Sequence, residues 1–318
     1  MREPWFWRSE TIAARSLRMA LAPVASLYQA GYQTRLALAK PQRASVPVIC
    51  IGNATLGGTG KTPFAMLVSD MLKEEGVKPF FLTRGFRGAE AGPLVVDPDK
   101  HDACDVGDEA LLLSQRAKTI VARDRPKGAA LAAKEGADAI IMDDGFQNPS
   151  LTKDLSVLLI GEDDSGALFP AGPFRESLDH AKARAQITVA MGRDKSSADF
   201  RAWLEPINPA PERVIAFAGI GKPEKFFKTL EDAGYDLVQR VGFPDHHIYT
   251  EAEERFLARE GRREKARLIC TEKDAVKLTP EFRADVLTLP VRMRVDDPAA
   301  LKRRLMAVIN EGRKGRAA

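Results

Sequence analysis

The residues with the clearest chemical meaning lie in the stretch IGNATLGGTGKTPF, residues 51–64. The apolar run VPVICI leads into it and a helical apolar pattern follows, so the sequence predicts a strand, a glycine-rich turn and a helix. Such a turn binds phosphate, because glycines let backbone N–H groups approach phosphate oxygens and the helix N-terminus adds partial positive charge. Lys61 is expected to neutralise the β- and γ-phosphates during catalysis, and Thr62 to hold Mg²⁺ through its hydroxyl. The predicted nucleotide contacts in this turn are Thr55, Leu56, Gly57, Gly58, Thr59, Gly60, Lys61 and Thr62.

The turn departs from the strict pattern GxxxxGK(S/T), which requires glycine at position 55, where this chain has Thr55. Its segment GGTGKT nevertheless resembles the GGxGKT core of the MinD-like branch of phosphate-loop NTPases. Leu56 occupies the position of the signature lysine of that branch, so the resemblance to its ATPase switches is incomplete. The competing interpretation is a tight turn that only caps a helix, but Gly-Lys-Thr directly after a strand is typical of a phosphate site.

A second acidic half of such a site is predicted in AIIMDDGFQN, residues 139–148. Here an apolar strand ends in Asp143 and Asp144, at the edge where the carboxyl ends of parallel strands face a ligand. One carboxylate would orient Mg²⁺ or its water, and the other would contact an outer ligand or the substrate. Taken alone, Asp-Asp-Gly is also a common turn sequence.

Short apolar runs alternate with longer helical patterns from position 46 onward, which is typical of a parallel sheet with crossover helices. A Pro-rich stretch at 205–214 interrupts this rhythm, and a shorter series of strands and helices follows it. We therefore expect an α/β fold: a phosphate-loop NTPase-like parallel sheet over residues 41–207 and a second, smaller α/β domain over residues 208–318 that closes the cleft.

The first 40 residues carry six basic and two acidic side chains, which accounts for the whole net charge of +4. They open with MREPWFWRSE and mix aromatic, apolar and arginine residues, a composition typical of helices at a membrane surface. The uncharged stretch between Arg18 and Arg35 is shorter than the ~20 apolar residues that a spanning helix needs. We expect residues 1–40 to form an amphipathic, membrane-associating helical segment; the alternative is an ordinary amphipathic helix packed on the domain.

The rest of the composition is that of a soluble globular chain long enough for two domains, with 318 residues, 44% hydrophobic and 29% charged. Cys50, Cys104 and Cys270 lie far apart without a CxxC pair, which predicts reduced thiols in the cytosol and neither disulfides nor a zinc site. We expect no nucleic-acid partner and no obligate protein partner.

Seven sequence blocks, in this order and spacing, resemble the tetraacyldisaccharide 4'-kinase (lipid A 4'-kinase) family. They are GNATLGGTGKTP, TRGFRG, VGDEALLL, DDGFQN, PAGPFRE, FPDHHIYT and TEKDAVKL. The resemblance implies Mg²⁺-dependent transfer of the ATP γ-phosphate to the 4'-hydroxyl of a tetraacylated glucosamine disaccharide 1-phosphate, at the cytoplasmic face of the bacterial inner membrane. A lipid acceptor would explain the basic, apolar N-terminal segment, because anionic headgroups attract nearby Lys and Arg side chains.

A sugar hydroxyl loses its proton during phosphate transfer, so a carboxylate or imidazole base should lie within hydrogen-bond reach. Asp108, in VGDEALLL, is the candidate base. The resemblance implies that Asp108 works as a dyad with His246, which either orients the carboxylate or relays the proton; His247 stays open as a substitute. The alternatives are a helix N-cap role for Asp108 and a structural loop role for His246.

Two arginine-containing blocks carry further expectations. Arg175 and Glu176 resemble family residues near the nucleotide and metal, and Glu176 is expected to contact the nucleotide; the alternative is a surface ion pair. Arg84 and Arg87, beside glycines after a strand, are candidates for a clamp on an anionic substrate group, with a solvated loop as the alternative.

Two further positions follow from the resemblance. TEKDAVKL, residues 271–278, is expected to line the nucleotide end of the cleft. The family usually has histidine after DDGFQ, where this chain has Asn148; an amide donates and accepts hydrogen bonds but takes up no proton. Proton handling is therefore not expected of Asn148.

Two other functions compete with the lipid kinase. A membrane-associated, MinD-like ATPase switch would have no small-molecule acceptor and would turn over ATP without the lipid disaccharide. A soluble kinase for another sugar or small cofactor would use the N-terminal segment only for packing. Leu56 and the Asp108/His246 pair argue against the switch.

Overall fold

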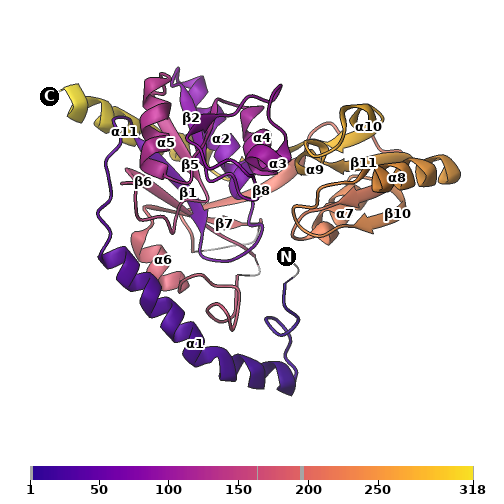
Figure 1. Cartoon of the computed structure of the whole chain (residues 1–318), viewed down its shortest axis with the longest axis horizontal. Coiled ribbons are helices and arrows are strands. Elements are labelled where there is room, and N and C mark those ends of the chain that lie inside the picture. The colour runs from indigo at the N-terminus through magenta and orange to yellow at the C-terminus, as the bar shows by residue number, and fades with distance from the viewer. Residues whose placement is uncertain (1–2, 163, 194–196, 318) are drawn as a thin grey trace.

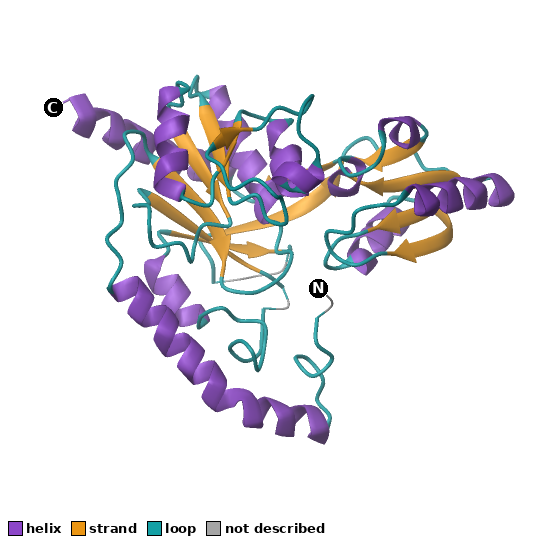
Figure 2. Ribbon diagram, in the orientation of Figure 1, coloured by secondary structure: helices purple, strands orange, loops and turns teal. Residues whose placement is uncertain are grey.

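A nine-stranded sheet forms the centre of the computed structural model, which describes residues 3–162, 164–193 and 197–317, with side chains as far as residue 312. The strand order is β13-β8-β7-β6-β1-β5-β2-β4-β3 (Figure 2). Strands β3 and β13, at the two edges, pair antiparallel with their neighbours, and the others are parallel. The strands are β1 (Val48–Asn53), β2 (Pro79–Thr83), β3 (Leu94–Val95), β4 (Thr119–Val121), β5 (Ala139–Asp143), β6 (Leu155–Ile160), β7 (Ile187–Met191), β8 (Phe200–Pro206) and β13 (Val291–Val295). The predicted parallel α/β sheet is confirmed.

Helices cover both faces of this sheet, because successive side chains of each buried strand point to opposite faces. In β1, Ile49 and Ile51 pack with α2 (Lys61–Glu74), α4 (Asp108–Ser114) and α11 (Pro298–Ala317). Val48 and Cys50 pack on the other face with α5 (Arg125–Lys134) and α6 (Leu178–Arg184). The short helix α3 (Ala103–Val106) precedes α4. Two apolar cores therefore hold the central strands rigid.

The position of β1 in the middle of the sheet determines where the site lies. β1 pairs with β5 on one side, with Ile51 opposite Asp143, and with β6 on the other. The turn after β1 and the acidic end of β5 therefore emerge side by side at the carboxyl edge of the sheet.

A smaller domain contains a four-stranded parallel sheet in the order β10-β9-β11-β12. Helix α7 packs on one face of it through Phe226, Phe227 and Leu230, and α8 on the other through Leu257. Its elements are β9 (Arg213–Ala218), α7 (Pro223–Asp232), β10 (Asp236–Gly242), α8 (Glu251–Glu264), β11 (Arg267–Thr271), α9 (Glu272–Ala275), α10 (Pro280–Ala284) and β12 (Val286–Leu289). Figure 1 shows this domain beside the large sheet.

The chain returns to the large sheet after β12, whereas the sequence was expected to place all of residues 208–318 in the smaller domain. Strand β13 pairs antiparallel with β8, with Met293 opposite Leu204. Met293 and Val295 join the core that holds α11 and α2. A boundary drawn from a single Pro-rich stretch could not reveal this, because the pairing of β13 with β8 joins segments far apart in the sequence.

The N-terminal segment forms a long helix, α1 (Ile12–Ala37), that extends below the large-sheet domain in Figure 1. Trp7, before the helix, donates its indole N–H to the carbonyl of Pro170 at 3.0 Å, and its ring meets Phe169 edge-on. Within α1 the buried side chains are Ala14 and Ala25. Among the residues described, no helix combines the length and apolar character needed to cross a membrane.

The return of the chain predicts that a core residue of α11 stabilises the large sheet. Leu305 has no exposed surface, so Leu305→Ala should lower the free energy of unfolding by about 2–5 kcal/mol through lost burial and a cavity. Urea unfolding followed by circular dichroism measures this. The exposed Glu311 on the same helix supplies the matched control, and Glu311→Ala should stay within about 0.5 kcal/mol of wild type. Equal stabilities of the two variants would show that α11 does not pack there in solution.

Candidate active site

Residues 54–60 form the glycine-rich turn between β1 and α2. Gly57 and Gly60 have φ angles of 126° and 79°, which residues with side chains rarely adopt. A Cβ atom on Gly60 would lie 3.1 Å from Met191 Cε, whereas one on Gly57 would meet nothing within 4 Å. Thr59 accepts a hydrogen bond from the Asn53 amide at 2.5 Å. The turn is therefore packed against protein on one side and open to a ligand on the other.

The segment 164–175 braces the turn from outside. The Leu56 N–H donates to the carbonyl of Pro173 at 2.8 Å. The Thr55 hydroxyl donates to Asp164 at 3.1 Å, so threonine occupies this position as part of the support of the turn. Thr55 and Leu56 both line the cleft described below.

Lys61 lies over the turn at the start of α2. Its Nζ donates to the carbonyl of Gly57 at 3.3 Å and lies 3.7 Å from Asp144 Oδ1. Asp144 also pairs with Arg175, 3.2 Å away. Burial raises the pKa of Asp144, but Lys61 and Arg175 outweigh burial, so that its pKa is lowered and the group stays ionised. Positive charge therefore gathers where phosphate oxygens would approach the backbone N–H groups.

Thr62 and Asp143 meet behind Lys61. The Thr62 hydroxyl donates to Asp143 Oδ2 at 3.0 Å. Asp143 Oδ1 is buried and, among the described residues, has no hydrogen-bond partner. Burial, together with the nearby Glu109 and Asp144, raises the pKa of Asp143 to about 7.

These two side chains fit Mg²⁺. The described residues contain no group of three or more His, Cys, Asp or Glu side chains suited to hold a metal by themselves. Mg²⁺ does not require one, because it is commonly held by one or two carboxylates together with phosphate oxygens and waters. The free oxygen of Asp143 and the hydroxyl of Thr62 are ligands of the kind this ion uses.

The turn faces a cleft of about 1770 Å³ that both domains line. Gly221, at the start of the smaller domain's α7 region, is close enough that a Cβ atom on it would lie 3.8 Å from the Gly58 N–H nitrogen. The cleft is lined from the large sheet by residues 55–62, Asp144 and Arg175, and from the smaller domain by Ile220, Lys222, His246, Thr271 and Lys273. A nucleotide bound at the turn would therefore contact the smaller domain as well.

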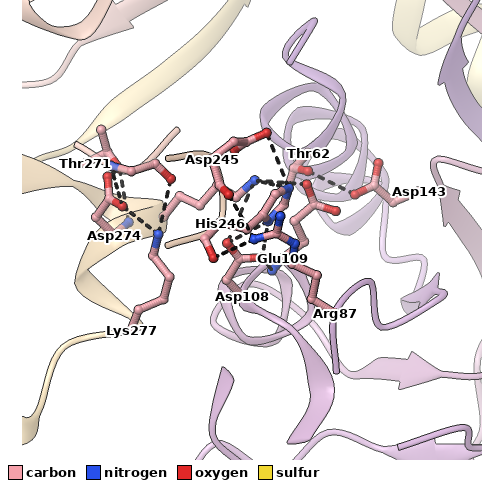
Figure 3. Close-up of polar contacts among 12 residues, drawn as sticks. Thr62, Arg87, Asp108, Glu109, Asp143, Asp245, His246, Thr271, Asp274 and Lys277 are labelled. Atoms are coloured by element: carbon pink, nitrogen blue, oxygen red, sulfur yellow. Dashed lines mark hydrogen bonds and ion pairs between the residues drawn. The ribbon is translucent and has the colours of Figure 1, made fainter. Parts of the chain in front are cut away.

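Asp108 and His246 pair across the two domains, as Figure 3 shows. His246 Nδ1 lies 2.9 and 3.0 Å from the two carboxylate oxygens of Asp108. The Asp108 side chain is 4% exposed and does not line the cleft, whereas His246 does. The predicted pair is thus brought together, with the carboxylate behind the imidazole.

Lys273 and Glu109 lie next to the Asp108–His246 pair. Lys273 Nζ lies 3.1 Å from Glu109, 3.9 Å from Asp108 and 3.5 Å from His246 Nε2. Burial opposes the charge of both Asp108 and Lys273. Even so, the pKa of Asp108 is lowered by the His246 hydrogen bond and Lys273, and the pKa of Lys273 is raised by Glu109 and Asp108. A protonated Lys273 beside Nε2 favours the tautomer in which Nδ1 carries the proton and donates it to Asp108.

His247 points away from this pair. Its Nε2 lies 3.0 Å from Glu253, within the smaller domain, and its ring stacks on Phe243. His246 rather than His247 therefore contacts Asp108.

Glu176 does not line the cleft, contrary to its expected nucleotide contact. Its carboxylate is fully buried and accepts hydrogen bonds from Tyr32 of α1 at 3.1 Å, Gln147 at 3.1 Å and Arg184 at 2.5 Å. It also pairs with His180 at 2.8 Å. Tyr32 of α1, His180 and Arg184 of α6, and Gln147 from the loop after β5 together satisfy this buried charge.

The block TEKDAVKL divides between two environments. Thr271, Glu272 and Lys273 line the cleft, as expected. Asp274 is fully buried, pairs with Lys277 at 2.6 Å and accepts the Gly219 N–H at 3.0 Å. Glu109 was missed as a site residue, and Lys273 was expected at the nucleotide end of the cleft but not beside the Asp108–His246 pair. Their adjacency to Asp274 and Asp108 in the sequence was visible, but only the fold shows that they meet.

Comparison with known proteins agrees with this geometry. The family model described as Tetraacyldisaccharide-1-P 4'-kinase matches residues 17–310. The chain belongs to this family. A tetraacyldisaccharide 4'-kinase of Parvibaculum lavamentivorans is 43% identical, over 99% of this chain and 100% of the relative. Another, from Paramagnetospirillum magneticum, is also 43% identical, over 95% and 97%.

A solved structure extends the similarity to three dimensions. The crystal structure of LpxK from Aquifex aeolicus in complex with ATP matches with a TM-score of 0.78 and 29% identity, over 92% of this chain and 99% of that one. The tetraacyldisaccharide 4'-kinase family is thus supported by sequence and fold together. The MinD-like switch is not favoured.

The Thr62–Asp143 contact predicts a specific defect in metal-dependent nucleotide binding. Thr62→Ala removes the hydroxyl that would bind the ion and that donates to Asp143 Oδ2. Affinity for Mg²⁺·ATP should therefore fall by roughly 10-fold or more. Thr62→Ser keeps the hydroxyl and should bind nearly as wild type. Titration with a fluorescent ATP analogue, with Mg²⁺ and with EDTA, measures the difference; the loss should vanish in EDTA. Wild-type affinity of Thr62→Ala in Mg²⁺ would exclude this residue as a ligand.

Proposed function

We propose that this protein transfers the γ-phosphate of ATP to the 4'-hydroxyl of a tetraacylated glucosamine disaccharide 1-phosphate, a step of lipid A biosynthesis. The observation that carries the proposal is the Asp108–His246 pair, whose imidazole lines the same cleft as the glycine-rich turn. A simple ATPase switch has no need of a base opposite its phosphate site. The relatives named above are kinases for this acceptor.

The nucleotide half of the mechanism belongs to the turn and α2. Backbone N–H groups around Gly57 and Gly58 would hold phosphate oxygens, with Thr55, Leu56, Thr59 and Gly60 keeping the turn in shape. Lys61 would neutralise charge on the β- and γ-phosphates, moving from Asp144 to do so.

Mg²⁺ would be held by Thr62 and by Asp143, with Asp144 next to them. When bound, the ion neutralises the charge that develops on the transferred phosphoryl group. The buried Asp143 Oδ1, which has no hydrogen-bond partner among the described residues, supports this assignment, because a buried carboxylate oxygen without a partner is otherwise costly.

Proton transfer is best served by His246 as the relay and Asp108 as its anchor. Asp108 is buried, accepts the Glu109 N–H at 2.9 Å and has both oxygens near His246 Nδ1. His246 lines the cleft, and its Nε2, which Lys273 Nζ approaches at 3.5 Å, would accept the proton of a substrate hydroxyl. The carboxylate then stabilises the imidazolium that forms. This geometry supports uptake of the proton by His246, with Asp108, the expected base, in the supporting role.

The proposal is tested by transfer of labelled γ-phosphate from Mg²⁺·ATP to a tetraacyl disaccharide 1-phosphate in detergent micelles. Asp108→Asn and His246→Ala should each slow transfer by roughly 10²–10⁴-fold without weakening ATP binding. His247→Gln, next to His246 but paired with Glu253, is the matched comparison and should keep most of the rate.

Two results would contradict the proposal. ATP hydrolysis that depends on membranes, with no labelled lipid, would indicate an ATPase switch. Transfer to a water-soluble sugar with no transfer to the lipid would indicate a kinase of another class. Full activity of His246→Ala would leave the kinase but remove the relay.

We propose further that the protein acts at the cytoplasmic face of the bacterial inner membrane, as a peripheral protein attached through α1. Large apolar side chains on α1 are exposed, among them Ile12, Met19, Val24 and Leu27. At about 100° per residue they fall on one broad face of the helix, opposite the buried Ala14. Exposed apolar surface of this kind, beside a net positive charge, suits an anionic lipid surface.

Membrane attachment predicts that one charge on this face weakens binding to lipid. Leu27→Glu should lower the fraction of protein that floats with anionic phosphatidylglycerol-containing liposomes, by roughly 10-fold in affinity, since an inserted leucine is lost and a repelled charge is gained. Gln33→Glu introduces the same charge at an exposed position about 120° around the helix from Leu27 and should cost less. Equal flotation of the two variants and wild type would exclude this face as the attachment.

A further inference from the structure

The loop after β2 contains a residue in a costly backbone conformation. Arg87 has φ of 65°, in the left-handed region that favours glycine. Two glycines flank this part of the loop, Gly85 and Gly88, so the sequence supplies glycine nearby but not at this position. Non-glycine residues persist in such a conformation where the surroundings require it, and they gather at functional sites.

The side chain of Arg87 crosses from the large sheet to the smaller domain. Its Nη1 donates to the carbonyl of Asp245 at 2.9 Å and to the carbonyl of His246 at 3.0 Å. The ring of the preceding residue, Phe86, meets the His246 ring edge-on with centroids 5.1 Å apart. Figure 3 shows Arg87 beside the Asp108–His246 pair.

The receiving segment is itself held in an unusual shape. His246 has φ of 57°, and its N–H donates to the carbonyl of Gly219 at 3.1 Å. The His246 N–H is thus bonded within the smaller domain, while its carbonyl accepts from Arg87 and its ring contacts Phe86. The same loop therefore contacts the backbone and the ring of the histidine that meets Asp108.

We propose that Arg87 is a positioning residue that latches the smaller domain to the large sheet and holds His246 against Asp108. The left-handed arginine is retained because a glycine there would lack the guanidinium that binds the two carbonyls. This inference rests on the proposed function, in which His246 relays the proton. Arg87 also lines the cleft, so direct contact with an anionic group of the substrate is the competing role.

Two substitutions separate the latch from the backbone strain. Arg87→Gly removes the guanidinium and relieves the left-handed conformation, so kcat for lipid phosphorylation should fall by roughly 10- to 100-fold while Tm stays at or above that of wild type. Arg87→Ala also removes the guanidinium but keeps the strain, so kcat should fall equally while Tm drops. ATP affinity should be unchanged in both.

Lys265 provides the matched control. It is exposed, ends α8 and has φ of 50°, so Lys265→Gly relieves the same kind of strain without touching the cleft. Its Tm should stay at or above that of wild type, and its kcat should equal that of wild type.

A double variant tests whether Arg87 acts through His246. In a His246→Ala background, Arg87→Gly should cause no further loss of kcat, because there is no imidazole left to position. A second readout is hydrogen exchange of backbone amides 244–248, which should quicken in Arg87→Gly and in Arg87→Ala.

Four outcomes would overturn the latch: wild-type kcat in Arg87→Gly, multiplied losses in the double variant, unchanged exchange at 244–248, or a raised KM for the lipid with kcat unchanged. The last would indicate direct contact with the substrate. Failure of the wild-type protein to phosphorylate the lipid would refute the proposed function instead. The wild-type assay therefore comes before the assays of the variants.

Discussion

Each half of the candidate site depends on a buried carboxylate that lies behind a side chain of the cleft. Asp143 lies behind Thr62, and Asp108 lies behind His246. A buried carboxylate must be paired or hydrogen-bonded, so each one determines the orientation of the residue in front of it. For Asp108 that residue comes from the other domain, and the pairing therefore requires the two domains to meet at this point. The geometry of the site therefore depends on the relative placement of the two domains.

The connections between the domains make that placement reproducible. Strand β8 leads into the smaller domain and β13 leads back, and the two pair with each other at the edge of the large sheet. The smaller domain is thus inserted between two hydrogen-bonded neighbouring strands rather than attached by one flexible tail. A rotation about this strand pair would change the distances of Lys273 and His246 from Asp108.

Local sequence patterns predicted the parallel sheet, the strand–turn–helix around Lys61 and the ending of β5 in Asp143, because buried strands and glycine-rich turns have local signatures. The pairing of Asp108 with His246 was predicted from the family resemblance and not from the spacing of the two residues in the sequence. The return of β13 could not be predicted, since antiparallel pairing with β8 is a long-range choice. Nor could the position of Glu176 be predicted, because its partners come from α1, from α6 and from the loop after β5.

Glu176 also shows how the N-terminal helix and the nucleotide site share one support. Tyr32 of α1 and Gln147 both donate to its carboxylate. Gln147 in turn accepts a hydrogen bond from Arg175 at 3.1 Å, and Arg175 pairs with Asp144 in the cleft. The residue that the resemblance placed beside the nucleotide therefore reaches it only through neighbours. Its hydrogen bonds tie α1 to the group of side chains that orients Asp144, so the proposed lipid attachment and the proposed phosphate chemistry would depend on the same side chains.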